Sequence, residues 1–193
     1  MALPGGDDGR AHGPRPVAVL LVGLPAAGKT VRARQLEREL PALRFTPDEW
    51  MLPLFGVLDA MERRDVLEGR LLTTALAAVR LGTSVVVDFG LWSRDERWAL
   101  RRLFTDAGAR CRLVHLDVDP ATQRARVDAR RAAAPHEEVE MSDAALRGYR
   151  EAFQDPGPDE LSGDEVPDPP AGHRTWAAWA AQRWPSLRPD PPG

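Results

Sequence analysis

The sequence predicts an α/β fold, a parallel sheet of four to five strands flanked by helices. Short apolar runs alternate along the chain with longer segments of helix-forming composition, the order typical of strand–helix–strand units. Residues 17–22 are apolar throughout, as expected of a strand that helices cover on both faces. With 193 residues, the chain is long enough for one domain with a hydrophobic core and short for two. We therefore expect a single domain over residues 17–193.

The first strand leads directly into a glycine-rich segment. This segment, Gly23-Leu24-Pro25-Ala26-Ala27-Gly28-Lys29-Thr30, fits the pattern G-x-x-x-x-G-K-[ST] and opens into a helix expected over residues 31–40. Gly23 and Gly28 allow backbone conformations in which successive N–H groups surround a phosphate at a helix N-terminus. Lys29 is placed to contact the β- and γ-phosphates of a nucleotide, and the Thr30 hydroxyl to ligate Mg²⁺. The segment predicts a phosphate-binding loop and hence a P-loop NTPase fold. The flanking strand and helix disfavour the alternative, a turn that matches by chance.

The alternation continues after the loop. A strand over residues 43–45 precedes a helix with Thr46 as expected N-cap, Pro47 as first residue and Glu49 closing a capping box, so that Asp48 lies in the first turn. The next expected elements are a helix over 62–81 ended by Gly82, a strand over 84–88, a helix capped by Ser93 and Glu96 that runs to Ala107, a strand over 111–116, and a helix over 120–133. The last are a helix from Ser142 to Phe153, a Pro- and acid-rich loop over 155–172, and a terminal helix over 174–184. A fifth strand is not visible.

Composition excludes several classes of protein. The net charge is −3, with acidic and basic residues mixed, so the strongly basic surface of a nucleic-acid-binding protein is absent. Cys111 is the single cysteine, which excludes an internal disulfide and a Cys-rich zinc site. No signal sequence or membrane-spanning apolar run is visible, and residues 1–16 read as a flexible tail. We expect a cytoplasmic protein with no membrane partner.

Two aspartates follow predicted strands, at the end of the sheet where the phosphate loop lies. Asp48 is the candidate base that accepts a proton from an attacking hydroxyl, and Asp88 the candidate carboxylate that assists Mg²⁺ binding. The structural alternatives are that Asp48 only complements a helix dipole and that Asp88 only caps a turn.

The predicted helix over 120–133 carries four arginines: Arg124, Arg126, Arg130 and Arg131. Arg126 and Arg130 are four residues apart, so they project from one face, as a helical lid over nucleotide phosphates requires. The alternative is a solvated surface helix whose charge is balanced by Asp128 and other acids.

Aromatic residues near the strand ends are candidates for an acceptor pocket. Trp50 and Trp92 are possible substrate-pocket residues, although core packing is the commoner role of such residues. Trp98 is expected in the core, and His115, inside a strand, is expected to be structural.

The chain resembles the chloramphenicol phosphotransferase-like and zeta-toxin-like P-loop kinases, which are ATP-binding small-molecule kinases of the AAA type. The resemblance lies in the phosphate loop, the segments from Leu36 to Pro41 and from Leu43 to Asp48, Leu52-Pro53, the run Val85-Val86-Val87-Asp88 and the arginine helix. The resemblance covers residues 17–153. It implies that Asp48 activates an acceptor hydroxyl and that Arg126 and Arg130 bind and stabilise ATP phosphates. It does not distinguish the neighbouring Arg131 from these two arginines. The segment after Phe153 departs from the group.

The resulting hypothesis is a phosphotransferase that moves the γ-phosphate of ATP, with Mg²⁺, to a hydroxyl of a small molecule such as an antibiotic or a sugar nucleotide. A polynucleotide 5′-hydroxyl kinase is one alternative, although the acidic balance disfavours nucleic acid as a partner. The other is an ATP-dependent switch or binding module without catalysis, with the Trp-bearing C-terminal segment as its contact surface.

Overall fold

The computed structural model describes residues 14–56, 61–133, 141–163 and 165–188. Most of the tail expected over residues 1–16 lies outside these residues. No helix in the described part of the chain is long and apolar enough to cross a bilayer.

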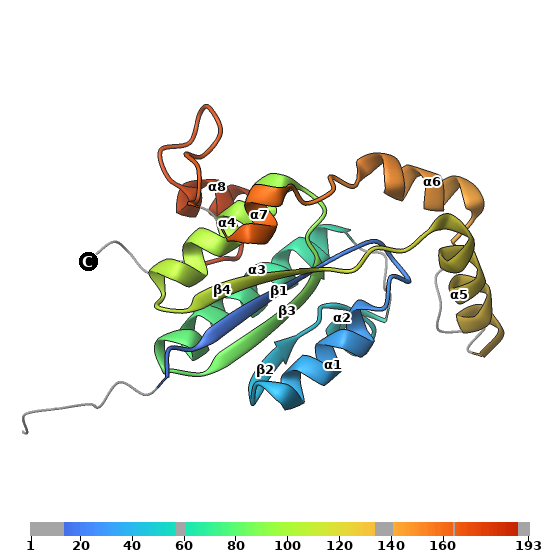
Figure 1. Ribbon diagram of the computed structural model, residues 1–193, viewed down its shortest axis with the longest axis horizontal. Coiled ribbons are helices and arrows are strands. Elements are labelled where there is room, and N and C mark those ends of the chain that lie inside the picture. Colours follow the sequence, from blue (N-terminus) through green and yellow to red (C-terminus); the bar gives the residue numbers. More distant parts are fainter. Residues whose placement is uncertain (1–13, 57–60, 134–140, 164, 189–193) are drawn as a thin grey trace, which may run out of the picture.

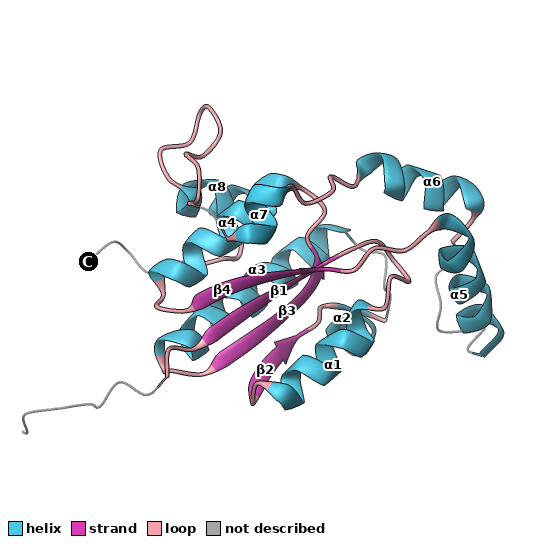
Figure 2. Ribbon diagram, in the orientation of Figure 1, coloured by secondary structure: helices cyan, strands magenta, loops and turns pink. Residues whose placement is uncertain are grey.

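The described residues form a parallel sheet of four strands (Figures 1 and 2). The strands are β1 (Val17–Val22), β2 (Ala42–Phe45), β3 (Ser84–Gly90) and β4 (Arg110–His115), in the spatial order β2-β3-β1-β4. Every neighbouring pair is parallel, so all the carboxyl ends meet at the same end of the sheet. The predicted fold class is therefore confirmed.

Helices cover both faces of the sheet (Figure 1). They are α1 (Lys29–Glu39) on one face, and α3 (Met61–Arg80), α4 (Arg94–Asp106) and α8 (Trp176–Arg183) on the other. Leu20 belongs to the apolar cluster of α3, α4 and α8, whereas its neighbour Leu21 joins Ala33 and Leu36 of α1. Successive strand side chains point to opposite faces, which is why β1 must be apolar at every position.

The remaining helices include α5 (Pro120–Ala133) and α6 (Asp143–Ala152), which lie beyond the carboxyl ends of the strands (Figure 1). Both were expected, and Ser142 caps α6 by accepting a hydrogen bond from the Ala145 amide at 3.2 Å. The capping box of α4 is also confirmed, since Ser93 and Glu96 exchange hydrogen bonds of 3.1 Å. These helices bring chain from far along the sequence to the end of the sheet where β1 leads into the phosphate loop.

The start of α2 (Asp48–Phe55) differs from the prediction. Its N-cap is Pro47, and no side chain of the described residues caps it. The Thr46 hydroxyl, expected to cap the helix, instead accepts a hydrogen bond from Arg44 Nη1 at 2.7 Å. Glu49 pairs with Arg44 at 3.0 Å rather than closing a capping box. The strand arginine competes successfully for both capping groups.

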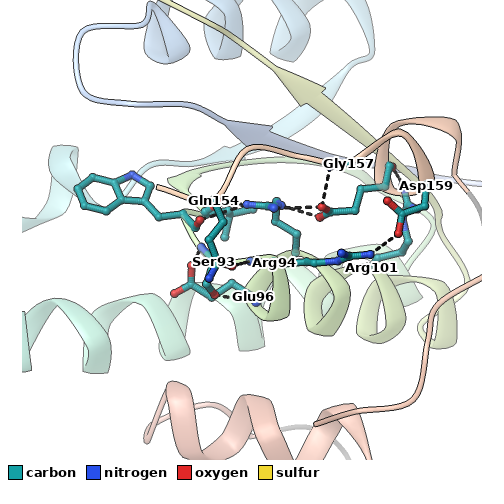
Figure 3. A network of polar contacts seen from close by, with 11 residues as sticks. Ser93, Arg94, Glu96, Arg101, Gln154, Gly157 and Asp159 are labelled. Carbon is teal, nitrogen blue, oxygen red and sulfur yellow. Dashed lines mark hydrogen bonds and ion pairs between the residues drawn. The ribbon is translucent and has the colours of Figure 1, made fainter. Parts of the chain in front are cut away.

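A short helix, α7 (Pro158–Ser162), interrupts the expected Pro- and acid-rich loop. It is held to α4 by a buried ion pair, in which Arg97 Nε and Nη2 donate to the two carboxylate oxygens of Glu160 at 2.6 and 3.1 Å. Around this pair, Arg94 bonds to Asp159 through its side chain and to Gln154 through its amide (Figure 3). The described residues contain no fifth strand, and α7 packs beside β4 instead.

Candidate active site

The phosphate loop has the backbone geometry that the sequence predicts for it. Gly28 is the N-cap of α1 in the left-handed conformation, with φ of 99°. At Gly23, with φ of 153°, a Cβ atom would lie 2.5 Å from the Leu116 carbonyl oxygen. A side chain at Gly23 would therefore collide with the backbone that follows β4. The loop thus presents backbone N–H groups at the start of α1, the arrangement that binds phosphate in helix-terminal anion sites.

Lys29 folds back over the loop. Its Nζ donates to the carbonyl oxygens of Gly23 and Leu24, both at 2.9 Å. Burial lowers the pKa of Lys29, and the carboxylates of Asp88 and Asp48 oppose this decrease. The ammonium group is therefore held at the mouth of the loop, within electrostatic reach of both candidate carboxylates.

Asp88 lies inside β3, which continues to Gly90, rather than at the strand end as predicted. The side chain is buried, and its Oδ2 atom has no hydrogen-bond partner among the described residues. Burial raises the pKa of Asp88, while Lys29 and a hydrogen bond with the Thr30 hydroxyl lower it. A buried carboxylate oxygen without a partner, beside a threonine hydroxyl, fits the all-oxygen ligand set of Mg²⁺. The described residues hold no group of three or more His, Cys, Asp or Glu that could bind a metal.

Asp48 opens α2, and its side chain is 65% exposed. Its Oδ1 accepts a hydrogen bond from Arg64 Nη1 of α3 at 2.6 Å. The Asp48 charge also raises the pKa of both Lys29 and Asp88, so the three groups share one end of the sheet. Sequence reasoning missed Arg64. The available signal was its spacing of four residues from Glu68 on a predicted helix, which is a common surface pattern.

Helix α5 rests on the phosphate loop. Arg126 Nη1 donates to the Ala26 and Ala27 carbonyl oxygens at 3.1 and 3.2 Å. Gln123 Nε2 donates to the Pro25 carbonyl oxygen at 2.9 Å, and sequence reasoning missed this residue because glutamine carries no charge pattern. Arg130 is close enough for its charge to lower the pKa of Lys29.

The other two arginines of α5 behave differently from Arg126 and Arg130. Arg124 bonds to Asp128 at 2.5 Å and to the Met141 carbonyl oxygen at 2.7 Å, so it ties α5 to the segment before α6. Arg131 is exposed near the end of the helix. The predicted face of Arg126 and Arg130 therefore lies toward the loop, and Arg124 does not share its contacts.

The candidate pocket aromatics lie on different elements. Trp92 follows β3 and packs against Tyr149 of α6, with ring centroids 5.2 Å apart. Trp50 is 49% exposed on α2, whereas Trp98 is buried in the core as expected. Contacts of Trp50 and Trp92 with a substrate stay predictions.

A cavity of about 120 Å³ lies beside the phosphate loop at the end of β4. It is lined by Leu24, His115, Val118, Arg150, Phe153 and Asp155, among others. His115 stacks on Phe153 with ring centroids 5.8 Å apart, the structural role expected for this histidine. Arg150 bonds to Gln123 at 2.7 Å, so α6 supports the same contact through which α5 holds the loop.

A glycine-rich loop of this geometry, between the first strand of a parallel sheet and the helix that follows, defines a P-loop NTPase fold. The chain belongs to the AAA_33 family, described as an AAA domain, which matches residues 19–156. No curated protein matches the sequence significantly. The narrower resemblance to chloramphenicol phosphotransferase-like and zeta-toxin-like kinases stays a prediction.

Similar solved structures share this fold at low sequence identity. A chain of the Pnkp1/Rnl/Hen1 RNA repair complex has a TM-score of 0.60 and 18% identity; the match covers 77% of this chain but only 46% of that one, so this protein spans less than half of its length. The APS kinase CysC of Mycobacterium tuberculosis, in complex with AMPPNP and APS, has a TM-score of 0.55 and 22% identity over 88% of this chain and 96% of that one. A gluconokinase from Sinorhizobium meliloti 1021 has a TM-score of 0.52 and 16% identity, over 90% of this chain and 92% of that one.

Proposed function

We propose that the protein is a kinase that transfers the γ-phosphate of ATP to a hydroxyl group of a small molecule. The observation that carries this proposal is the position of Asp48. Its exposed carboxylate lies at the open end of the sheet and within electrostatic reach of Lys29. A nucleotide switch needs a phosphate loop and a metal ligand but no such carboxylate, whereas hydroxyl phosphorylation needs a proton acceptor.

The proposed reaction assigns a task to each group. The acceptor oxygen bonds to the γ-phosphorus while the bond to the β,γ-bridging oxygen breaks and ADP leaves. The hydroxyl proton passes to the Asp48 carboxylate. Lys29 exchanges its loop carbonyl partners for phosphate oxygens, and Arg126 and Arg130 stabilise the charge on the transferred group. Mg²⁺, which Thr30 and Asp88 would hold, supplies positive charge to the phosphate oxygens.

The nature of the acceptor is inferred from charge and from the named relatives. Two of the similar structures are kinases named for APS and for gluconate, and the net charge of −3 disfavours a nucleic acid as the acceptor. One of the similar structures is a chain of the Pnkp1/Rnl/Hen1 RNA repair complex, so a polynucleotide 5′-hydroxyl is the second candidate acceptor. The cytoplasm, which supplies ATP and Mg²⁺ and keeps Cys111 reduced, is the proposed setting.

The test is transfer of the labelled γ-phosphate of ATP, with Mg²⁺, to a panel of hydroxylated antibiotics, sugar nucleotides, sugars and oligonucleotides with a 5′-hydroxyl. We expect Asp48→Asn to lower transfer by roughly 10²- to 10⁴-fold while ATP binding is retained. Asp143→Asn is the matched control, since Asp143 is also an exposed aspartate in the first turn of a helix and contacts an arginine. Loss of ATP affinity with normal turnover at saturation would contradict the role of Asp48.

The same panel separates the alternatives. Transfer to the oligonucleotide alone, with binding that falls steeply as salt rises, would indicate the polynucleotide kinase. ATP binding that depends on Lys29, without transfer to any acceptor, would favour the switch.

A further inference from the structure

The chain after α8 lies along α3. Trp184 and Leu187 are buried, the Ser186 hydroxyl bonds to the Val66 carbonyl oxygen, and the Arg188 amide bonds to Thr73 Oγ1 at 3.1 Å. Close approach is possible because Gly69 of α3 has no side chain. A Cβ atom there would lie 2.5 Å from Ser186 Oγ and 2.7 Å from the Leu187 nitrogen. We call residues 184–188 the docked segment.

Three consecutive hydrogen bonds join the docked segment to Asp48. Trp184 Nε1 donates to Glu68 Oε2 at 2.9 Å. Arg64 Nε donates to the other carboxylate oxygen of Glu68 at 2.9 Å, and Arg64 Nη1 donates to Asp48 at 2.6 Å. Glu68 is only 5% exposed, so its carboxylate is fixed by these two donors rather than by water.

Arg64 lies between two carboxylate groups, those of Asp48 and Glu68. Burial would lower the pKa of Arg64, but Asp48 and Glu68 raise it overall, so the guanidinium is a fully charged group between two carboxylates. A cation neutralised in this way attracts an anionic acceptor weakly. It can instead hold the Asp48 carboxylate in one rotamer, which solvent alone would not do for a side chain that is 65% exposed.

A second contact strengthens the attachment. Arg183, the last residue of α8, bonds to Asp65 of α3 at 2.6 Å and to Glu96 of α4 at 2.7 Å. The C-terminal segment is therefore fixed to α3 on both sides of Glu68, and movement of the docked segment would release the carboxylate that orients Arg64.

We propose that Arg64 is a positioning residue for Asp48 and that the docked segment, through Trp184 and Glu68, holds Arg64 in place. This rests on the proposed function, because it assigns a task to the base. The C-terminal segment would then be part of the acceptor side of the active site, although it lies more than a hundred residues from Asp48 in the sequence.

The first experiment measures the connection itself, without an acceptor. Trp184→Phe keeps an aromatic side chain, although a smaller one, and removes the donor to Glu68. We expect it to increase solvent exchange of the Arg64 Nε–H signal in NMR spectra and of the backbone amides of α2. Gly69→Ala, which displaces the docked segment, should do the same, whereas Gly148→Ala should change neither, since nothing lies within 4 Å of a Cβ atom on this helical glycine of α6. Unchanged exchange at Arg64 and α2 in folded Trp184→Phe would overturn the proposal whatever the activity.

The second experiment measures transfer to the best acceptor of the panel, or to water. We expect Trp184→Phe and Arg64→Gln to lower kcat by roughly 10- to 100-fold, with KM and Kd for ATP within about twofold of wild type, because a misplaced base slows chemistry more than binding. A normal kcat in Trp184→Phe, or a loss of ATP affinity as large as the loss of kcat, would show that Trp184 has only a structural role. If Asp48→Asn transfers phosphate at the normal rate, the proposed function fails. If transfer depends on Asp48 but not on Trp184, the proposed function stands and the positioning role fails.

Discussion

Arg126 makes a hydrogen bond of 3.1 Å from its Nη1 atom to the Ala26 carbonyl oxygen of the phosphate loop. Carbonyl oxygens are weaker acceptors than phosphate, so this guanidinium is already in position and has a better partner to gain when a nucleotide binds. Gln123, one turn earlier on α5, keeps the helix against the loop through the Pro25 carbonyl oxygen. The arginine helix therefore contacts the phosphate loop directly.

Arg126→Gln should weaken ATP binding by roughly 10- to 100-fold, because a hydrogen bond to a charged partner contributes about 1.5–3 kcal/mol. Titration of ATP, followed by calorimetry, measures this effect. Arg124→Gln on the same helix is the control, since Arg124 bonds to Asp128 and Met141 rather than to the loop. Equal losses in the two variants would show that α5 acts through its overall charge.

Asp88→Asn should abolish the Mg²⁺ dependence of ATP binding and change the pH dependence of stability. Burial raises the pKa of Asp88 in the folded protein, so the folded state holds this proton more tightly than the unfolded state does. The stabilisation that comes from protonated Asp88 is therefore complete below the pKa of this residue in the unfolded chain, about 4. It is lost as the pH rises through the pKa of Asp88 in the folded protein. The free energy of unfolding of Asp88→Asn relative to wild type should increase over that range, because asparagine does not ionise and so does not pay the growing cost of a buried charge. Urea unfolding at a series of pH values measures this, and a difference that does not vary with pH would contradict it.

The geometry of the loop and the position of both candidate aspartates near one end of the sheet could be predicted from short stretches of sequence, although Asp88 lies inside β3 and the roles of the two aspartates stay predictions. The phosphate loop is contained in eight consecutive residues, and Asp48 and Asp88 lie at the carboxyl ends of apolar runs. The contact between Trp184 and Glu68 joins residues 116 apart, and the local pattern that Glu68 forms with Arg64 does not point to Trp184. Contacts between side chains this far apart in the sequence depend on how the elements pack together, and the spacing of residues along the chain does not predict that packing.

Charged residues caused two differences from the predicted elements, at α7 and at the start of α2. Helix α7 lies in a segment whose Pro-rich, acidic composition is typical of loops, and it depends on the distant Arg97 to neutralise Glu160. The predicted capping box at Thr46 and Glu49 was wrong because Arg44, on the preceding strand, takes both groups as partners. Local propensity was correct at Ser93 and Ser142, whose hydroxyl groups accept the expected hydrogen bonds from backbone amides.

Cys111 should react slowly with thiol reagents while the protein is folded. The side chain is partly buried, and the resulting loss of hydration raises its pKa to about 12, an increase that the charge of Arg101 only partly opposes. Because the thiolate is the reactive form, labelling with Ellman's reagent at pH 8 should be roughly a hundredfold or more slower than in urea. Rapid labelling of the native protein would show that the edge of the sheet at β4 opens readily.

Glu160→Gln should destabilise the protein by about 3–5 kcal/mol, because it leaves Arg97 charged and buried without its partner. Both side chains are only 1% exposed, so water cannot replace the lost carboxylate. Asp159→Asn is the control on the adjacent residue of α7, since its pair with Arg94 is exposed and should contribute less than about 1 kcal/mol. Replacing both buried partners, as in Arg97→Met with Glu160→Leu, should recover much of the loss, because no unpaired charge remains. Urea unfolding of the four proteins measures each difference, and a double variant no more stable than Glu160→Gln would mean that packing of α7, rather than the unpaired charge, accounts for the loss.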